Sequence, residues 1–200
     1  MRYYYSKCLE FYKLYGRKGL IRKTINTIFR WLPAHPLRRI RSIIFLDNSS
    51  VRIGKNVIFK GMSYKLMLNN NIVFYDHAIL EFGTKSEIRI GNNCLFSYGV
   101  LLAINLKLDI GENVQIGEYS SIRDTTHIYN KVNLPIKYSG DLSEGITIGN
   151  DVWIGRGCLI QPGTVIEDGV IVAANSVVKG RLEKNKIYGG IPAKYIKDRF

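Results

Sequence analysis

The chain has 200 residues, with 29 Lys and Arg against 16 Asp and Glu, and a formal net charge of +13. This length allows one domain of ordinary size with an appendage, and a hydrophobic content of 46% is enough for a core. No stretch reaches the roughly 18 apolar residues needed to cross a bilayer, and the N-terminus lacks the features of a signal peptide. The composition therefore predicts a cytoplasmic protein and argues against an integral membrane or secreted one.

The first part of the chain, residues 1–46, is a basic segment. Residues 1–45 hold eleven Lys and Arg against a single acidic residue, Glu10. The spacing of its apolar residues predicts an amphipathic helix, which Pro33 and Pro36 end before a short second element. Two roles remain open: a cap over the end of the domain that follows, or contact with anionic lipid at the inner face of the membrane. No nucleic-acid partner is expected.

From residue 47 onward the chain is expected to form a single repeat domain, 47–200. Short β-prone runs alternate with turns rich in Asn, such as Asn69–Asn71 and Asn92–Asn93. Asn tolerates the left-handed backbone conformation that tight corners need. We therefore expect these residues to shape corners and not to bind ligands.

The strongest pattern is a six-residue repeat near the C-terminus. Every sixth residue there is aliphatic: Ile148, Ile154, Ile160, Ile166, Val172 and Val178. A helix buries one face every 3.6 residues and a strand every second residue, so a period of six indicates a coil in which each hexapeptide forms one side. The same frame appears at Ile110, Ile116 and Ile122 and, more weakly, from Ile72 to Leu102.

The six-residue frame slips in two places. One slip lies near Ala103 to Asn105, and the other lies between Ile122 and Ile148. Such slips mark loops that leave a solenoid, and the loops of repeat proteins often carry function. We therefore expect a functional loop at about 123–147, and a C-terminal tail at about 186–200 after the last repeat.

The three cysteines, Cys8, Cys94 and Cys158, form no CxxC pair. Cys94 and Cys158 each follow an aliphatic residue of the repeat by four positions, where a small buried side chain is needed, so inert reduced thiols are expected. No metal is expected, because a zinc site of three imidazoles, as in the γ-type carbonic anhydrases, needs one histidine more than the two, His77 and His127, in the repeat region.

Two motifs give the chain a resemblance to a known family: VWIG at Val152–Gly155 and GIPA at Gly190–Ala193. From about Val51 to the C-terminus, the chain resembles the left-handed parallel β-helix acyltransferases of the hexapeptide-repeat superfamily, and among them the galactoside, maltose and polysaccharide O-acetyltransferases. We therefore expect an all-β solenoid, a left-handed parallel β-helix, with the basic helical segment at its N-terminus and a short helix at its C-terminus. The resemblance also implies a homotrimer of parallel prisms with active sites between subunits.

His127 is the candidate general base. It lies five residues after Ile122, where the chain leaves the repeat for the long loop. Acyl transfer from a thioester to a hydroxyl needs a base that works near neutral pH, and imidazole suits this task. The resemblance implies the same residue, since the galactoside and maltose enzymes place their catalytic histidine at the start of the matching loop. Asp124 is a candidate to orient the imidazole, with capping of the loop as the alternative.

The resemblance also implies that acetyl-CoA, the acyl donor, lies along the C-terminal coils. The candidate donor contacts are Trp153, Gly155, Arg156, Ala173, Ala174, Lys179, Gly180, Lys194 and Lys197. The alanines would let pantetheine approach, and the lysines would meet the CoA phosphates. Several of these positions differ from the galactoside enzymes, so the contacts are expected as a region. Candidates on the acceptor side are Ser97, which replaces an Asn of the family, Tyr98 and Arg123.

The resemblance, together with the position of His127, implies an acetyl-CoA-dependent O-acetyltransferase. Its acceptor would be a sugar hydroxyl in the biosynthesis of a surface polysaccharide, which could be a capsule, O-antigen or exopolysaccharide. An N-acetyltransferase of an amino sugar and a xenobiotic acetyltransferase are alternatives on the same fold. An alternative of a different class is a non-catalytic β-helix that binds or scaffolds, although such a protein would not need the loop histidine.

Overall fold

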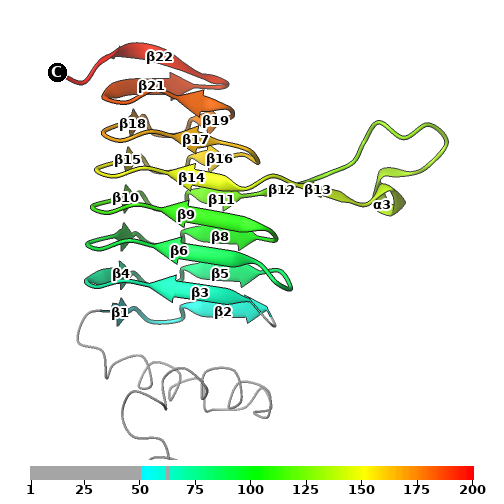
Figure 1. Cartoon of the computed structure of the whole chain (residues 1–200), viewed down its shortest axis with the longest axis horizontal. Coiled ribbons are helices and arrows are strands. Elements are labelled where there is room, and N and C mark those ends of the chain that lie inside the picture. The colour runs from blue at the N-terminus through cyan, green and yellow to red at the C-terminus, as the bar shows by residue number, and fades with distance from the viewer. Residues whose placement is uncertain (1–50, 62–63) are drawn as a thin grey trace, which may run out of the picture. The chain divides into compact units, whose positions relative to one another are not determined.

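The computed structural model describes residues 51–61 and 64–200, and the fold is given for these residues. They form an all-β parallel solenoid, and Figure 1 shows its strands stacked from β1 to β22. The predicted helical segment at 1–46 and the boundary after residue 46 lie outside the described residues, so both stay predictions. No helix in the described part of the chain is long and apolar enough to cross a membrane.

Each coil contributes one strand to each of three sheets, which we name A, B and C. Sheet A contains β1 (Val51–Ile53), β4 (Ile72–Phe74), β7 (Leu95–Phe96), β10 (Gln115–Ile116), β15 (Trp153–Ile154), β18 (Ile171–Val172), β21 (Lys186–Gly190) and β22 (Ala193–Asp198). Sheet B contains β2 (Ile58–Gly61), β5 (Ile79–Phe82), β8 (Leu101–Ile104), β11 (Ser121–Arg123), β16 (Leu159–Ile160) and β19 (Val177–Val178). Sheet C contains β3 (Lys65–Leu68), β6 (Glu87–Ile90), β9 (Lys107–Ile110), β14 (Ile146–Ile148), β17 (Val165–Ile166) and β20 (Arg181–Leu182).

The aliphatic residues of the repeat point into the coil and stack in columns. In sheet A, Ile116 pairs with Ile154 and Ile154 with Val172, and in sheet B Ile122 pairs with Ile160. All five are fully buried. The period of six therefore corresponds to one side of a coil per hexapeptide, as the sequence predicts. This column of branched side chains is the core, and it fixes which residues of each strand face outward.

The weaker repeat that starts at Ile72 is only partly in frame. Ile72 and Ala78 are buried, but Thr84 is exposed in the turn between β5 and β6. The residues that stack with the aliphatic columns are Phe74 and Leu80, two positions later than the expected ones. The frame fails because the corners between sheets B and C vary in length from coil to coil, whereas the other corners are regular. Both predicted slips lie at these variable corners.

Asn residues shape the corner between sheets C and A, as predicted. Asn71, Asn93 and Asn113 have φ angles of 57°, 58° and 59°, in the left-handed region. Their amides form a ladder along the corner: Asn71 Nδ2 donates to Asn93 Oδ1 at 2.9 Å, and Asn93 Nδ2 donates to Asn113 Oδ1 at 3.1 Å. Each side-chain amide thus donates a hydrogen bond to the Asn side chain of the next coil.

The two described cysteines are buried and free, as predicted. Cys94 Sγ lies 3.2 Å from the carbonyl oxygen of Gly111, and Cys158 Sγ lies 3.2 Å from that of Ala173. Burial raises the pKa of both thiols above the ordinary value, because the interior disfavours the thiolate. These cysteines fill small interior positions of the coil.

The C-terminal tail corrects one prediction. The expected short C-terminal helix is wrong, because residues 193–198 form strand β22, which pairs antiparallel with β21. The pairing covers the edge of sheet A that the last coil would otherwise expose, and an unpaired edge is unfavourable. Tyr188 packs against Tyr195, with ring centroids 6.1 Å apart, and Arg199 Nη1 donates to Asp151 Oδ2 at 2.8 Å. The tail is thereby fixed to the preceding coils.

The long loop leaves the solenoid between β11 and β14. It contains β12 (Thr125–His127), the short helix α3 (Ile136–Ser139) and β13 (Asp141–Ser143). β12 and β13 pair antiparallel, so the loop is a hairpin, and we call residues 124–145 the hairpin arm. Figure 1 shows this arm extending sideways from the stack of strands. It is the predicted functional loop, and its root adjoins the outer face of sheet B.

Candidate active site

A pocket of about 350 Å³ lies where the hairpin arm meets sheet B. Its lining is mostly polar, and the residues that form it are Glu81, Ala103, Asn105, Arg123, Thr125, Thr126, His127 and Asp141. Two predicted site residues, His127 and Arg123, are therefore brought together in it. The other six lining residues were not among the predicted site residues: Glu81, Ala103, Asn105, Thr125, Thr126 and Asp141.

Sheet B supplies the floor of the pocket. Glu81 pairs with Ala103 and Ala103 with Arg123 on three adjacent strands, β5, β8 and β11. Each of these residues directly follows a buried residue of its strand, namely Leu80, Leu102 or Ile122. Successive side chains of a strand point to opposite faces, so the three lining residues project outward. The small side chain of Ala103 leaves space between Glu81 and Arg123, which places opposite charges two strands apart on one floor.

His127 and Asp141 form the polar pair of the pocket. They lie opposite each other in the β12–β13 register, and His127 Nδ1 is 2.6 Å from Asp141 Oδ1. The Asp141 carboxylate can only accept a hydrogen bond, so Nδ1 carries the proton and donates it. This arrangement leaves Nε2 free to accept a proton. Both side chains are open to solvent, at 73% and 51% exposure, so a substrate can reach them.

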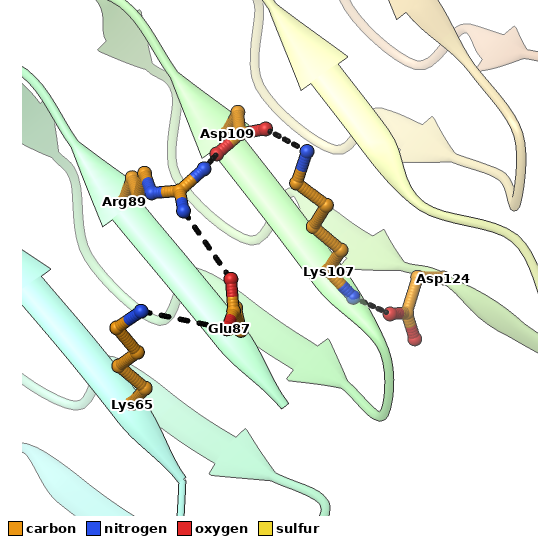
Figure 2. A network of polar contacts seen from close by, with 6 residues as sticks. All are labelled: Lys65, Glu87, Arg89, Lys107, Asp109 and Asp124. Atoms are coloured by element: carbon orange, nitrogen blue, oxygen red, sulfur yellow. Dashed lines mark hydrogen bonds and ion pairs between the residues drawn. The ribbon is translucent and has the colours of Figure 1, made fainter. Parts of the chain in front are cut away.

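Asp124 has a different position from the one that orienting His127 would need. It is fully buried, and its carboxylate accepts hydrogen bonds from the backbone N–H groups of residues 105–107 at 2.7–2.9 Å and from Thr125 Oγ1 at 2.9 Å. Figure 2 shows the contact with Lys107. The buried carboxylate therefore fastens the root of the arm to the preceding coil, as in the capping alternative, and Asp141 is the carboxylate in contact with His127.

Arg123 and Glu81 carry charges that no ion pair with a described residue neutralises. The guanidinium of Arg123 and the carboxylate of Glu81 both line the pocket and are exposed. Four other arginines of the described part are in ion pairs, for example Arg89 with Asp109 at 3.3 Å and Arg199 with Asp151 at 2.8 Å. The pocket thus offers a free cation and a free anion beside the imidazole, which suits a polar acceptor.

The predicted donor contacts lie away from His127 in the single chain. Gly155 and Ala174 stack in the corner between sheets A and B, where a Cβ on Gly155 would come within 2.7 Å of the Ala174 nitrogen. Ala173 adjoins the same corner, and Arg156 there pairs with Glu118 at 3.4 Å. These residues therefore form one corner surface that runs along the later coils.

The remaining donor candidates occupy other edges of the solenoid. Trp153 lies on the outer face of sheet A and is 54% exposed. Lys179 and Gly180 form the corner between β19 and β20, and Gly180 has a φ of 84°. The other two lysines are exposed on β22: Lys194 and Lys197. One chain therefore does not gather all of the predicted donor residues around His127.

The two other acceptor candidates lie at the corner between sheets A and B. Ser97 and Tyr98 follow β7, and neither lines the pocket that holds His127. Tyr98 is half exposed, and its ring lies 5.1 Å from that of Tyr75 in the neighbouring coil. Arg123 is thus the acceptor candidate that the fold brings to the histidine.

Comparison with known proteins identifies the repeat. Residues 145–180 match the model described as bacterial transferase hexapeptide (six repeats). The probable acetyltransferase Rv3034c of Mycobacterium tuberculosis is 30% identical over 115 residues, which are 58% of this chain and 38% of that protein. The chain therefore spans about two fifths of the length of this curated relative. The matched repeat coincides with the aliphatic columns of β14 to β19.

The chain therefore carries the hexapeptide repeat of bacterial transferases over residues 145–180.

Two solved acyltransferase structures share the fold. A hexapeptide-repeat containing acetyltransferase from Vibrio cholerae is 22% identical with a TM-score of 0.55, covering 96% of this chain and 93% of that one. A variant of AntD, an N-acyltransferase from Bacillus cereus, is 22% identical with a TM-score of 0.60, covering 83% and 90%. That AntD structure contains dTDP-4-amino-4,6-dideoxyglucose and coenzyme A. At these identities the likeness extends to the fold, and the ligands are those of AntD.

Proposed function

We propose that this protein is an acetyl-CoA-dependent O-acetyltransferase that acetylates a sugar hydroxyl, in the biosynthesis of a surface polysaccharide. The observation that carries the proposal is the pair of His127 and Asp141, 2.6 Å apart in a pocket that also holds Arg123. The match of residues 145–180 to the bacterial transferase hexapeptide model and the coenzyme A in the AntD structure, which has the same fold, support acetyl-CoA as the donor.

The chemistry follows from the free Nε2 of His127. This nitrogen takes the proton of the acceptor hydroxyl as its oxygen attacks the acetyl carbonyl of the thioester. The C–S bond then breaks, and the imidazolium returns the proton to the departing thiolate of CoA. Asp141 keeps Nδ1 as the donor and stabilises the imidazolium, so we assign it as a positioning residue.

We further propose a homotrimer of parallel left-handed coils. The donor candidates at Gly155 and Ala174 lie on a different corner from His127, so a neighbouring chain would be needed to bring the two groups together. The outer faces of the sheets support this. Sheet A presents the apolar Trp153 outward, and sheet B presents Leu101, Leu159 and Val177 beside the polar floor of the pocket. Sheet C instead carries a ladder of paired charges, Lys65–Glu87–Arg89–Asp109–Lys107, which suits a face in water (Figure 2).

An N-acyltransferase that acts on an amino sugar is the second candidate. The observation that favours it is Glu81, whose carboxylate lines the pocket without an ion-pair partner among the described residues. A carboxylate there would attract the ammonium form of an amine acceptor. AntD, an N-acyltransferase, shares the fold.

The test is release of free thiol from acetyl-CoA with sugars, oligosaccharides, amino-sugar nucleotides and chloramphenicol as acceptors. For the wild type we expect release that depends on a hydroxyl acceptor, and for His127→Ala a loss of about 10² or more. His77→Asn is the matched control, because His77 lies in a corner with a φ of 64°, which Asn adopts readily, and lacks contact with the pocket. Turnover only with amine acceptors would favour the second candidate. Donor binding without any turnover in the wild type would favour a binding protein.

A further inference from the structure

The outer end of the hairpin arm exposes many apolar side chains. We call residues 128–140 the arm tip. Five large apolar side chains in it are between 40% and 86% exposed: Tyr129, Val132, Leu134, Ile136 and Tyr138. Figure 1 shows that this end points away from the stack of strands, so the coil of the same chain does not cover it. Several large exposed apolar side chains in one short segment indicate an interaction site.

The arm tip is also purely cationic. Residues 128–140 contain two lysines, Lys131 and Lys137, and no Asp or Glu. Lys131 Nζ donates to the Ser139 carbonyl oxygen at 2.8 Å, and Lys137 Nζ lies 5.7 Å from the Tyr138 ring centroid. The lysines thus stand among the apolar side chains, and no acidic residue of the tip neutralises them.

The tip has a defined conformation that holds these side chains outward. The Ile128 N–H donates to the Gly140 carbonyl at 2.9 Å, which continues the pairing of β12 and β13. Ser139 is buried, and its hydroxyl donates toward the carbonyl oxygens of Leu134 and Pro135 at 3.4 and 3.2 Å. Hydrogen bonds within the tip therefore hold its backbone, and its large apolar side chains remain exposed.

We propose that the arm tip docks on the surface of an anionic membrane. Tyrosine rings and lysines with long aliphatic stems suit the boundary between headgroups and acyl chains, and anionic headgroups attract a segment that lacks carboxylates. Interfaces between proteins are, by contrast, depleted in Lys. Tyr129, Val132 and Ile136 enter the boundary region, while Lys131 and Lys137 meet the headgroup phosphates.

Membrane docking also has a consequence for the acceptor, which rests on the proposed function. β12 and β13 carry His127 and Asp141 at the base of the same arm. A docked tip holds this pair close to the membrane surface, so an acceptor sugar carried on a lipid reaches the pocket more readily than a free one.

The test is flotation of the full chain with phosphatidylcholine vesicles, with and without phosphatidylglycerol. We expect the wild type to float with the anionic vesicles, and the triple variant Tyr129→Ser, Val132→Ser, Ile136→Ser to lose about fivefold or more of its bound fraction. The matched control is Ile191→Ser, Ile196→Ser, Phe200→Ser, which removes three equally exposed apolar side chains from the C-terminal end. This control should float like the wild type.

Two outcomes overturn the proposal. In one, the arm triple variant floats as well as the wild type, which would assign membrane binding to another part of the chain. In the other, the variant has a lower mass by light scattering in the absence of vesicles, which would show that the tip contacts a second copy. Thiol release with a soluble acceptor separates the two proposals, since the arm variant should keep it. Flotation without any turnover would leave the docking intact and remove the proposed function.

Discussion

Asp141 Oδ1 lies 2.6 Å from His127 Nδ1, although 14 positions separate the two residues in the sequence. The contact exists because β12 and β13 pair directly, which sets one residue opposite the other. Both side chains are more than half exposed, and an exposed ion pair contributes little to stability. The consequence of the contact is therefore chemical, since it decides which imidazole nitrogen is free.

Replacement of Asp141 by Asn should reduce catalysis without unfolding the protein. We expect kcat for thiol release to fall by about 10-fold to 100-fold. The Asn amide can donate a hydrogen bond to Nδ1, and the imidazole proton then lies on Nε2, which can no longer accept the proton of the acceptor. KM for acetyl-CoA and the unfolding midpoint should stay close to those of the wild type. Asp141→Glu keeps a carboxylate and should recover part of kcat. An equal loss in both variants would contradict the positioning role.

Replacement of Asp124 by Asn should, by contrast, lower the stability of the fold. The buried carboxylate accepts three backbone N–H bonds, and an amide can accept them only in part and adds two donors without partners. We expect a loss of about 2–4 kcal/mol in the free energy of unfolding, measured by denaturant titration. Asp109→Asn, an exchange of a partly exposed carboxylate on sheet C, is the control and should cost less than about 1 kcal/mol.

The Asn ladder can be tested at Asn93. Asn93→Ala removes both ladder hydrogen bonds and places a residue with a Cβ but no local hydrogen bond at a φ of 58°, so we expect a loss of about 1–3 kcal/mol. Asn93→Gly loses the same amide bonds but accepts this φ without strain. It should therefore be the more stable of the two by thermal unfolding. The reverse order would mean that backbone conformation is unimportant at this corner.

The buried thiols predict that the stability of the fold decreases at alkaline pH. Burial raises the folded-state pKa of Cys94 above 9.0, so the folded protein holds this proton at pH values where the unfolded chain has lost it. Stability from this group is therefore full below about pH 9 and falls as the pH rises toward the folded pKa. In a Cys8→Ser background, native protein should react slowly with an alkylating reagent at pH 8, and denatured protein should react at once at two sites. Rapid labelling of the native protein would contradict burial.

The predictable part of the fold came from one repeated physical requirement. Ile148, Ile154 and Ile160 each fill one side of the same narrow coil, so burial imposes a period of six that is visible in the spacing of aliphatic residues along the sequence. The corners behave likewise, since Asn71 and Asn93 occupy backbone conformations that few residues tolerate. The C-terminal helix was mispredicted because antiparallel pairing of β22 with an open strand edge outweighs local preference.

The candidate site, like the fold, has features that the sequence predicts and features that only the tertiary structure shows. The sequence alone determined the coil, its corners and the position of His127, because these depend on local spacing and on the residue types that a coil requires. Only the tertiary structure decided that Asp141 meets the imidazole and that Asp124 is a buried anchor. It also decided that Glu81 and Arg123 share a floor two strands apart. The contacts of Asp124 and the shared floor join residues from different coils, whose separation along the chain depends on corner lengths that follow no period. The contact of Asp141 with His127 depends instead on the pairing of β12 with β13 inside the arm.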